Sequence, residues 1–447
     1  MIKIYDTMTR SLRDFVPLTE NVVNMYVCGP TVYNYIHIGN ARSAVAFDTI
    51  RRYFEYCGYT VNYISNFTDV DDKIIKAANE AGISTKELSD KFIAAFMEDT
   101  AQLGIKPATQ NPRVINYMDE IIAFVSTLVD KGFAYVSEGD VYFRVAKSNN
   151  YAKLANKTLE DLEIGASGRT DAETERKENP LDFALWKAAK EGEVSWDSPW
   201  GPGRPGWHIE CSVMATEILG DTIDIHGGGA DLEFPHHTNE IAQSEAKTGK
   251  TFANYWMHNG FVNVDNEKMS KSLGNFVTVH DMLKTVDGQV LRFFLATQQY
   301  RKPINFTEKA IHDAEVNLKY LKNTHSLPLT DQVNQDELQT YLEAFQEAMD
   351  DDFNTANGVT VLFDMAKWIN SGNYDETVKN AFEKILQVFG IVFEEETLDE
   401  DIEKLIEERQ AARANKDFAT ADRIRDELAA QGIKLLDTKE GVRWTRD

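Results

Sequence analysis

The sequence contains few cysteines, comparatively few basic residues and no long apolar run. Its 447 residues include three cysteines, Cys28, Cys57 and Cys211, which lie far apart and form no CxxC pair. This pattern excludes a disulfide framework. No stretch approaches the roughly 18 consecutive apolar residues that cross a membrane, and the first residues lack the apolar core of a secretion signal. We therefore expect a cytoplasmic protein that has no membrane partner.

Acidic residues outnumber basic ones, 72 to 47, which gives a net charge of −25. Such an excess argues against a protein that coats nucleic acid nonspecifically. The excess is uneven, because residues 331–403 carry a net charge of −16 whereas residues 404–446 carry +2. The final segment is therefore the part of the chain that best suits a polyanionic partner, although two charges alone decide nothing.

A chain of this length is too long for one hydrophobic core and predicts about two to four domains. Residues 22–66 show the alternation of a βαβ unit, with strands in "VVNMYV" and "TVNYISNF" and an amphipathic helix between them that Gly58 closes. Such a unit predicts a parallel sheet. The apolar stretches "DTIDIHGGG" and "YWMHNGFVNV" predict that the sheet resumes after residue 205.

The remaining segments have other patterns. Residues 112–205 include a hairpin pattern, "FAYVSEGDVYFRV", and a polar stretch, so we interpret them as an insertion that interrupts the sheet. From about residue 306 the apolar spacing is helical, including one run over residues 336–370. Residues 399–447 predict two charged helices and a small hairpin.

Two short motifs suit phosphate chemistry. "HIGN", residues 37–40, follows a strand and opens a helix, where free backbone N–H groups bind phosphate readily. Gly39 permits close approach of a ligand, and His37 and Asn40 can donate hydrogen bonds to it. "EKMSKSLGN", residues 267–275, is a cationic loop that can neutralise charge on a triphosphate. Taken alone, each motif fits a capped turn or a solvated loop better.

A third stretch, "DIHGGGADLEFPHHTNE", suits a metal. Three glycines directly after a strand suggest a backbone pressed against a ligand at the carboxyl edge of the sheet. Pro235 suits the first position of a helix, which would place His236 and Glu240 on one helix face, four residues apart. An isolated His/Glu pair is more often a surface contact. Cys211 lies at a strand-to-helix transition, after a Trp-His pair.

The order of "HIGN" near the N-terminus and "KMSKS" about 230 residues later resembles the class I aminoacyl-tRNA synthetases. The stretches "MYVCGPTVYNYIHIGN", "NFTDVDDKI", "RPGWHIECS", "DIHGGGADLEFPHHTNEIAQ" and "EKMSKSLGNF" resemble the cysteinyl-tRNA synthetase family in particular. The resemblance covers essentially the whole chain. It implies an α/β fold with a Rossmann-type parallel-sheet catalytic domain over residues 1–111 and 206–305 and an inserted connective subdomain over 112–205. It also implies a stem-contact and anticodon-binding helical bundle over 306–398, followed by a small tRNA-binding domain over 399–447.

The resemblance also implies the cofactors. Zn²⁺, one per chain, is expected on Cys28, Cys211, His236 and Glu240, and Mg²⁺ is expected with ATP. Zinc favours thiolates and deprotonates a thiol outright, so a zinc ion facing the amino-acid pocket would bind the thiol of cysteine in preference to the hydroxyl of serine. Four protein ligands normally make a closed structural site. If the substrate sulfur also binds, zinc must become five-coordinate or loosen one ligand, and we expect Glu240 to be the looser one.

The remaining roles implied by the resemblance concern three groups of residues. His37, Asn40, Lys268 and Lys271 are the expected catalytic residues. ATP is expected at His37, Gly39, Asn40, Gly228, Gly229, Asp231, Lys268 and Lys271. The segment from His226 to Asp231 is expected to lie near adenosine. The substrate cysteine is expected at Gly29, Thr31, Thr68, Trp207 and His236. Trp444, in the last hairpin, suits either packing or stacking on single-stranded bases.

The implied reaction activates L-cysteine with ATP to cysteinyl-adenylate and transfers it to the 3′ end of tRNA(Cys), in a monomeric enzyme. The class I quartet commonly ends in His, whereas Asn40 stands there in this chain. An amide donates a hydrogen bond but carries no charge, so we expect activity with a different pH response.

Three alternatives are weighed against this interpretation. A cysteine ligase with the same zinc chemistry but a small amino-sugar acceptor would lack the long helical C-terminal part. A zinc hydrolase that uses His236, His237 and Glu240 leaves both phosphate-type motifs unexplained. A noncatalytic RNA-binding protein is disfavoured by the intact Lys268 and Lys271.

Overall fold

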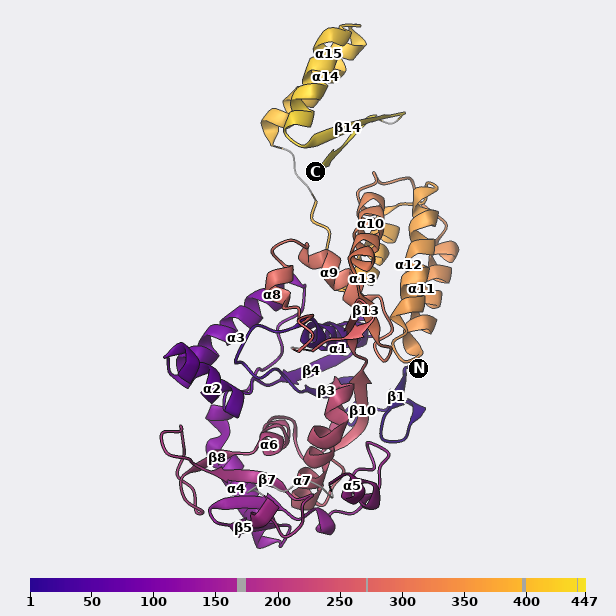
Figure 1. The fold of residues 1–447 in the computed structure, drawn as a ribbon. Helices are drawn as coiled ribbons and strands as arrows, with labels where there is room; N and C mark the ends of the chain where they lie inside the picture. Colours follow the sequence, from indigo (N-terminus) through magenta and orange to yellow (C-terminus); the bar gives the residue numbers. More distant parts are fainter. Residues whose placement is uncertain (167–173, 271, 396–398, 440) are drawn as a thin grey trace. The chain divides into compact units, whose positions relative to one another are not determined.

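The computed structural model describes the chain except residues 167–173, 271, 396–398 and 440 (Figure 1). The described residues form two compact units, Met1–Val392 and Phe393–Asp447. No helix among the described residues is both long and apolar enough to cross a bilayer.

The first unit is built on a parallel four-stranded sheet in the order β10-β9-β3-β4. Its strands are β3 (Val22–Val27), β4 (Thr60–Ser65), β9 (Ile223–Gly229) and β10 (Ala253–Asn259). Met25 pairs with Tyr63 on one side and with Ile225 on the other, and all three are buried. Strands covered on both faces need such near-continuous apolar sequences. The predicted parallel sheet, its βαβ unit and its resumption after the insertion are therefore confirmed.

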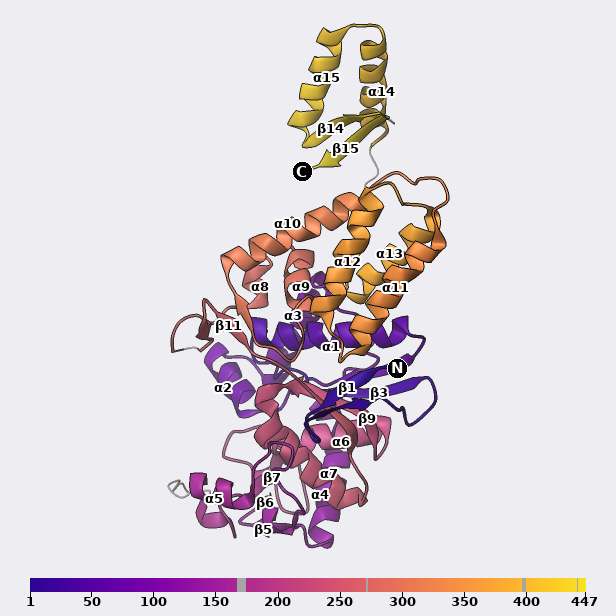
Figure 2. The same ribbon diagram turned by 90° about the vertical axis from the view of Figure 1, so that its right-hand side faces the viewer.

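Helices cover this sheet and continue into a bundle. Figure 2 shows α1 lying between the sheet and helices α9 to α13. The α-helices of the first unit outside the insertion are α1 (Ile38–Tyr56), α2 (Asp72–Ala81), α3 (Thr85–Gln102), α6 (Trp207–Leu219), α7 (Thr238–Thr248), α8 (Val279–Met282), α9 (Gly288–Ala296), α10 (Glu308–His325), α11 (Gln335–Asp350), α12 (Thr355–Asn370) and α13 (Glu376–Val388).

The single helical run expected over residues 336–370 is wrong, because the chain turns between α11 and α12. Asp352 and Phe353 have φ values of 53° and 52°, which end a right-handed helix. The buried carboxylate of Asp352 accepts hydrogen bonds from the Tyr300 hydroxyl (2.6 Å) and from Nε of Arg301 (2.6 Å). These long-range contacts stabilise a turn that the helical spacing of the sequence does not reveal.

The insertion contains its own antiparallel sheet, in the order β5-β6-β7-β8, which confirms the predicted hairpin. Its elements are η1 (Val114–Tyr117), α4 (Met118–Asp130), β5 (Ala134–Ser137), β6 (Asp140–Phe143), η2 (Val145–Lys147), α5 (Leu159–Ala166), η3 (Thr174–Arg176), β7 (Phe183–Ala188) and β8 (Gly203–Pro205).

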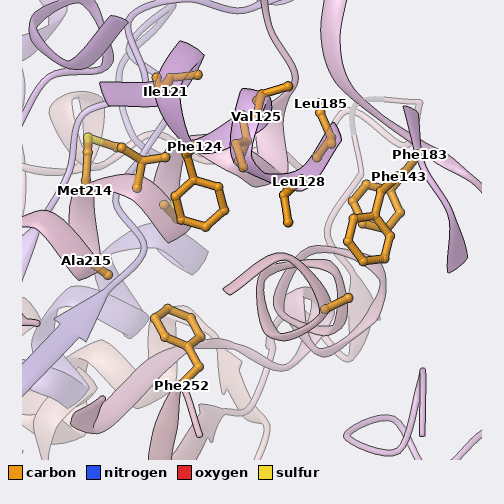
Figure 3. Packing of buried hydrophobic residues seen from close by; sticks show 14 of the residues in the cluster. Ile121, Phe124, Val125, Leu128, Phe143, Phe183, Leu185, Met214, Ala215 and Phe252 are labelled. Atoms are coloured by element: carbon orange, nitrogen blue, oxygen red, sulfur yellow. The ribbon is translucent and has the colours of Figure 1, made fainter. Parts of the chain in front are cut away.

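The insertion shares one hydrophobic core with the parallel-sheet part. Ile121, Phe124, Val125 and Leu128 form one face of α4, at the spacing of an amphipathic helix. Figure 3 shows this face together with Met214, Ala215 and Phe252 from the parallel-sheet part and with Phe143, Phe183 and Leu185 from the insertion. The insertion is therefore packed onto the sheet domain through helices α4, α6 and α7.

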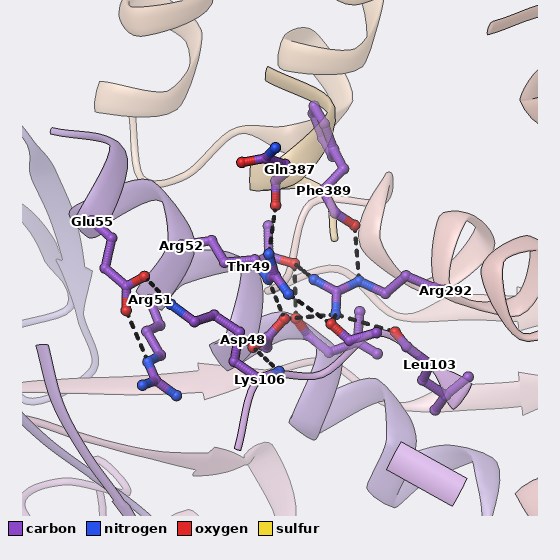
Figure 4. A network of polar contacts seen from close by, with 12 residues as sticks. Asp48, Thr49, Arg51, Arg52, Glu55, Leu103, Lys106, Arg292, Gln387 and Phe389 are labelled. Atoms are coloured by element: carbon purple, nitrogen blue, oxygen red, sulfur yellow. Dashed lines mark hydrogen bonds and ion pairs between the residues drawn. The ribbon is translucent and has the colours of Figure 1, made fainter. Parts of the chain in front are cut away.

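A buried ion-pair network joins α1 to the bundle (Figure 4). Arg292 on α9 is fully buried and donates to Asp48 on α1 (2.6 Å) and to the carbonyl oxygen of Phe389, just after α13 (2.9 Å). Arg52 donates to the same Asp48 (2.8 Å) and to the carbonyl oxygen of Gln387 (3.0 Å). Burial alone would raise the pKa of Asp48, but Arg292 and Arg52 outweigh it and hold that pKa below its usual value.

Short strands complete the first unit: β1 (Lys3–Asp6), β2 (Ser11–Asp14), β11 (Val262–Val264), β12 (Glu267–Lys268) and β13 (Ile304–Phe306). The second unit contains α14 (Glu400–Ala414), α15 (Phe418–Ala430), β14 (Ile433–Thr438) and β15 (Gly441–Arg446), as predicted. Trp444 packs against a small core of Ile402, Ile424, Leu428 and Ile433. This contact favours the packing interpretation of Trp444.

Candidate functional site

A cavity of about 720 Å³ lies at the carboxyl ends of β3, β9 and β10. Open α/β sheets bind their ligands at this edge. The loop after β3, the start of α1 and the segments after β9 and β10 line it. Among the predicted site residues, the described lining includes Cys28, Gly29, Thr31, His37, Gly39, Asn40, Trp207, Gly229, Asp231 and Lys268.

The His37–Asn40 quartet forms the first turn of α1. The backbone N–H of Asn40 donates to Nδ1 of His37 (3.2 Å), and the backbone N–H of His37 donates to Oδ1 of Asn40 (3.1 Å). This reciprocal pair is a capping box, which fixes the turn. The backbone N–H of Ile38 donates to the carbonyl oxygen of Val277 (3.1 Å), so the N–H groups of His37, Ile38 and Asn40 all have partners within the protein. Asn40 therefore has a capping role that the sequence reading did not assign to it.

Gly39 makes room for the histidine ring of the same quartet. A Cβ atom at this position would lie 2.9 Å from the ring of His37 and 3.7 Å from Cε of Met269. The glycine therefore permits the capped turn and the following lysine-containing loop to approach each other. The predicted role of Gly39, which is to let a ligand approach the backbone closely, is compatible with this packing against His37 and Met269.

The lysine-containing loop closes one side of the cavity. Lys268, Met269 and Ser270 line it, and the ammonium group of Lys268 lies 5.9 Å from the ring centre of Phe261. Asn275 fastens the loop internally, since it accepts from the backbone N–H of Ser270 (2.8 Å) and donates to the carbonyl oxygen of Lys268 (3.2 Å). The other predicted lysine, Lys271, lies outside the described residues.

Four predicted metal ligands converge beneath the cavity. The Sγ atoms of Cys28, just after β3, and Cys211, on α6, are 3.7 Å apart although 183 residues separate them. Oε1 of Glu240 on α7 lies 3.9 Å from Sγ of Cys28 and 3.7 Å from Nε2 of His236. One ligand atom from each of the four residues lies within 4.8 Å of those of the others. Two thiols, an imidazole and a carboxylate at these distances are a donor set that zinc favours.

The electrostatics of this cluster favour a bound cation. Burial raises the pKa of the Cys28 thiol and of the Glu240 carboxyl well above their usual values. Nε2 of His236 is buried and has no hydrogen-bond partner among the described residues, and Oε2 of Glu240 is buried beside Nε2 of His226 (2.7 Å) without a hydrogen bond of regular geometry. Buried polar atoms without partners are costly, and a divalent cation both satisfies them and favours the thiolate and carboxylate forms. The residues therefore fit a metal ion.

A second donor set shares two of these residues. Cys28 and Glu240 also lie within the same distance of His226 on β9 and of His237. Nε2 of His226 is 2.7 Å from Oε2 of Glu240, and Nε2 of His237 is 3.4 Å from Sγ of Cys28. Sequence reasoning placed His226 near adenosine, but it is fully buried and stacks on Trp256 (4.5 Å between ring centres). His226 lies in the middle of the buried strand β9 and pairs with Tyr26 of β3, two residues before Cys28, and its place in an apolar strand was the available signal.

The hydrolase alternative required His236, His237 and Glu240 at one metal. The two histidines instead belong to different donor sets. The imidazole of His237 has a different hydrogen-bond partner from that of His236, since its Nδ1 lies 2.8 Å from Nε2 of His258. Nδ1 of His236 lies 2.9 Å from Nδ1 of His208, whose pKa burial lowers to about 3, so His208 is a neutral partner that orients the His236 ring.

The backbone around the metal ligands kinks just before Pro235, because Phe234 has extended dihedral angles (φ −142°, ψ 131°). Pro235 follows this kink, and the chain is helical at His237 and continues into α7 from Thr238, so His236 and Glu240 meet as expected. The predicted glycines lie within β9, which extends through Gly229, rather than after it.

The residues predicted for the amino-acid pocket surround the cavity side of the metal ligands. Thr31 and Thr68 pair as a parallel bridge, and Thr68 is buried behind Thr31. The indole of Trp207 stacks on His236 (4.1 Å between ring centres) and is 40% exposed, which leaves one face for a ligand. Gly29 lies so close to the carbonyl oxygen of Asn66 that a Cβ atom would be 1.7 Å from it.

Sequence reasoning missed Asn66, which supports this pocket from behind. Its buried amide accepts from the backbone N–H of Gly29 (2.9 Å), donates to the hydroxyl of Thr68 (3.2 Å) and lies 3.8 Å from Sγ of Cys211. It is the first residue of the "NFTDVDDKI" stretch, one of those that carry the family resemblance. Asp71 of that stretch caps α2 (2.8 Å to the N–H of Lys73).

Comparison with known families assigns most of the chain. The model described as tRNA synthetases class I (C) catalytic domain matches residues 14–316. A DALR domain matches residues 344–394, and a cysteinyl-tRNA ligase anticodon binding domain matches residues 395–444.

Individual proteins agree with these matches. A cysteine–tRNA ligase of Streptococcus thermophilus (strain CNRZ 1066) is 96% identical over 447 residues, all of both chains. A cysteine–tRNA ligase of Streptococcus agalactiae (serotype III, strain NEM316) is 82% identical over the same length. Among solved structures, Mycobacterium tuberculosis methionyl-tRNA synthetase in complex with methionyl-adenylate matches with a TM-score of 0.60 at 15% identity, covering 82% of this chain and 89% of that one. At 15% identity, the likeness to the methionyl-tRNA synthetase concerns the fold alone.

Proposed function

The chain belongs to the cysteinyl-tRNA synthetase family and is a class I cysteine–tRNA ligase, and on that premise we propose that Cys28, Cys211, His236 and Glu240 hold a zinc ion that recognises the substrate thiol. The observation that carries the proposal is the convergence of two thiols, an imidazole and a carboxylate, with unpartnered buried atoms, directly beneath the cavity. When bound there, zinc supplies a preference for a thiolate over a hydroxyl. The set with Cys211 is favoured over the set with His226, because it offers two thiolates.

The protein residues around the metal ligands position the amino acid. Trp207 offers one exposed ring face, and Thr31, which is bridged to the buried Thr68, also lines the cavity. Asn66 holds Gly29 and Thr68 in place through its two hydrogen bonds. We assign Glu240 as the most loosely bound ligand, because His226 lies 2.7 Å from its second oxygen and competes for the carboxylate.

ATP occupies the half of the cavity between the His37–Asn40 turn and the Lys268 loop. The turn presents the positive end of the α1 dipole to phosphate oxygens. Lys268, and Lys271 from the same loop, neutralise charge that develops on pyrophosphate as the cysteine carboxylate attacks the α-phosphate, with Mg²⁺ on the phosphates. Gly228, Gly229 and Asp231 contribute the adenosine side. Positioning and charge stabilisation supply most of the rate, since no covalent enzyme intermediate is needed.

The activated cysteine is then transferred to the terminal ribose of tRNA(Cys). The anticodon-binding match at residues 395–444 favours a tRNA acceptor over the small amino-sugar acceptor of the alternative ligase. We propose a domain division at residues 111/112, 205/206, 305/306 and 398/399, with a monomeric enzyme that acts in the cytoplasm.

Substitution of Asn40 tests the proposed ATP side. Asn40→His adds a group that titrates near pH 6.5 and is cationic below it. A positive charge beside the triphosphate stabilises the transition state, so the rate of adenylate formation relative to the unmodified enzyme is expected to rise as the pH falls through about 6.5. ATP–pyrophosphate exchange at a series of pH values measures this. A pH profile identical to that of the unmodified enzyme would contradict the charge argument.

The zinc proposal has a direct test. Purified enzyme is expected to contain about one zinc per chain, and removal of the metal with a chelator is expected to abolish cysteine-dependent ATP–pyrophosphate exchange, because metal sites of this kind combine tight binding with ligand recognition. Zinc added back should restore exchange with cysteine but not with serine. Active enzyme that contains no metal would refute the proposal. Exchange without transfer to tRNA(Cys) would favour the small-acceptor ligase.

A further inference from the structure

The segment that follows the Lys268 loop is tied by its backbone to the His37 turn. The N–H of Ile38 donates to the carbonyl oxygen of Val277 (3.1 Å), and the N–H of Val279 donates to that of Ile36 (2.9 Å). His37 and Thr278 face each other in this two-stranded contact. The two motifs that line the ATP half of the cavity are therefore joined at one point, immediately upstream of α8.

Side chains from three elements hold that point together. The ring of His280, on α8, stacks on the ring of Tyr35, two residues before His37, with 4.1 Å between ring centres and 9° between planes. Nδ1 of His280 lies 3.3 Å from Oδ1 of Asp99 on α3. Tyr35 is in turn packed edge-on against Phe92 of α3 (5.2 Å). We name Tyr35, Asp99 and His280 the ring clamp.

The carboxylate of the ring clamp is held in an unusual environment. The Asp99 side chain is 2% exposed, and its Oδ2 has no hydrogen-bond partner among the described residues. Burial raises the pKa of Asp99, and the neighbouring His280 partly offsets this effect. A buried carboxylate with one partner depends strongly on that partner, so loss of the imidazole leaves an uncompensated polar group beneath the ATP half of the cavity.

We propose that His280 is a positioning residue for adenylate formation, acting through the ring clamp to fix the segment after the Lys268 loop against the His37 turn. The proposal rests on the assignment of the ATP half in the proposed function. His280 itself touches neither predicted substrate. It sets the distance between the phosphate-binding turn and the lysine-containing loop, and therefore affects ATP rather than cysteine.

The test compares His280→Ala with His312→Ala, which removes an exposed histidine of α10. His280→Ala is expected to raise KM for ATP in pyrophosphate exchange about tenfold, as expected for the loss of a hydrogen bond to a charged group. KM for cysteine and the zinc content should change by less than about twofold, because the metal ligands do not contact the ring clamp. His312→Ala should leave all three unchanged.

Two further variants keep the proposal falsifiable if His280→Ala folds poorly. His280→Phe retains the stacked ring and loses the contact with Asp99, so it should show part of the rise in KM for ATP. Asp99→Ala should raise it as well, and the double variant with His280→Ala should be no worse than the worse single variant, since both remove one interaction. An unchanged KM for ATP in folded His280 variants, or equal rises for ATP and cysteine, would overturn the proposal. Either outcome leaves zinc-dependent thiol selection intact, so it is distinguishable from a failure of the proposed function.

Discussion

Cys211→Ser is expected to release zinc and to reduce the preference for cysteine over serine in pyrophosphate exchange by about a thousandfold or more. The physical reason is that a site built around one specific bond can discriminate by about 10⁴–10⁵, and a serine hydroxyl is a poor zinc ligand at neutral pH. Cys211 also lies 3.7 Å from Sγ of Cys28, so its replacement removes half of the thiolate pair. Metal analysis and exchange with each amino acid measure the two effects.

Cys57→Ser is the matched control for this prediction. Cys57 is a free cysteine at the end of α1, outside both donor sets, so the same chemical change should leave zinc and selectivity unaffected. His237→Gln distinguishes the two donor sets. If Cys211 and His236 hold the metal, His237→Gln should weaken zinc binding by no more than about 100-fold, the usual effect of a supporting residue. A variant that loses Cys211 yet retains zinc and selectivity would identify the His226 set instead and contradict our assignment.

Arg292→Leu is expected to reduce the free energy of unfolding of the first unit by about 3–5 kcal/mol, the usual cost of removing one partner of a buried ion pair. Arg292 is fully buried and holds Asp48 of α1, the Thr49 hydroxyl and the carbonyl oxygen of Phe389. Its loss leaves Asp48 with Arg52 and the backbone N–H of Lys106, and removes the connection from α9 to the end of α13. Urea denaturation followed by circular dichroism measures the change.

Lys309→Ala provides the surface comparison, because Lys309 forms an exposed i,i+4 pair with Asp313 (2.7 Å). Exposed pairs of this kind contribute about 0.3–0.5 kcal/mol. The double variant of Arg292→Leu with Asp48→Leu should recover part of the loss, because the buried Asp48 carboxylate no longer has to be held without Arg292, and Arg52, which also loses its ion pair, is partly exposed. A single Arg292→Leu variant as stable as the unmodified enzyme would show that the network in Figure 4 contributes little.

Several features of the site could be predicted from the sequence because local spacing and donor chemistry carry them. The "HIGN" quartet was correctly placed at a strand-to-helix turn, and the βαβ unit followed from residue periodicity. The four donor types were available as Cys28, Cys211, His236 and Glu240, although their association came from family resemblance. Periodicity does not report a turn such as that at Asp352, because contacts with Tyr300 and Arg301 stabilise it.

The amino-acid sequence by itself determined the kinds of chemistry present: a phosphate-binding turn, a cationic loop, thiols without disulfide partners and alternating strands and helices. Only the tertiary structure decided which groups meet. It brought Cys28 to Cys211, placed His226 and His237 in a competing donor set, supported Gly29 with Asn66 and stacked His280 on Tyr35. The reason is physical. Periodicity and turn chemistry are properties of neighbouring residues, whereas these contacts join segments that only the packing of the sheet, its insertion and its covering helices brings together.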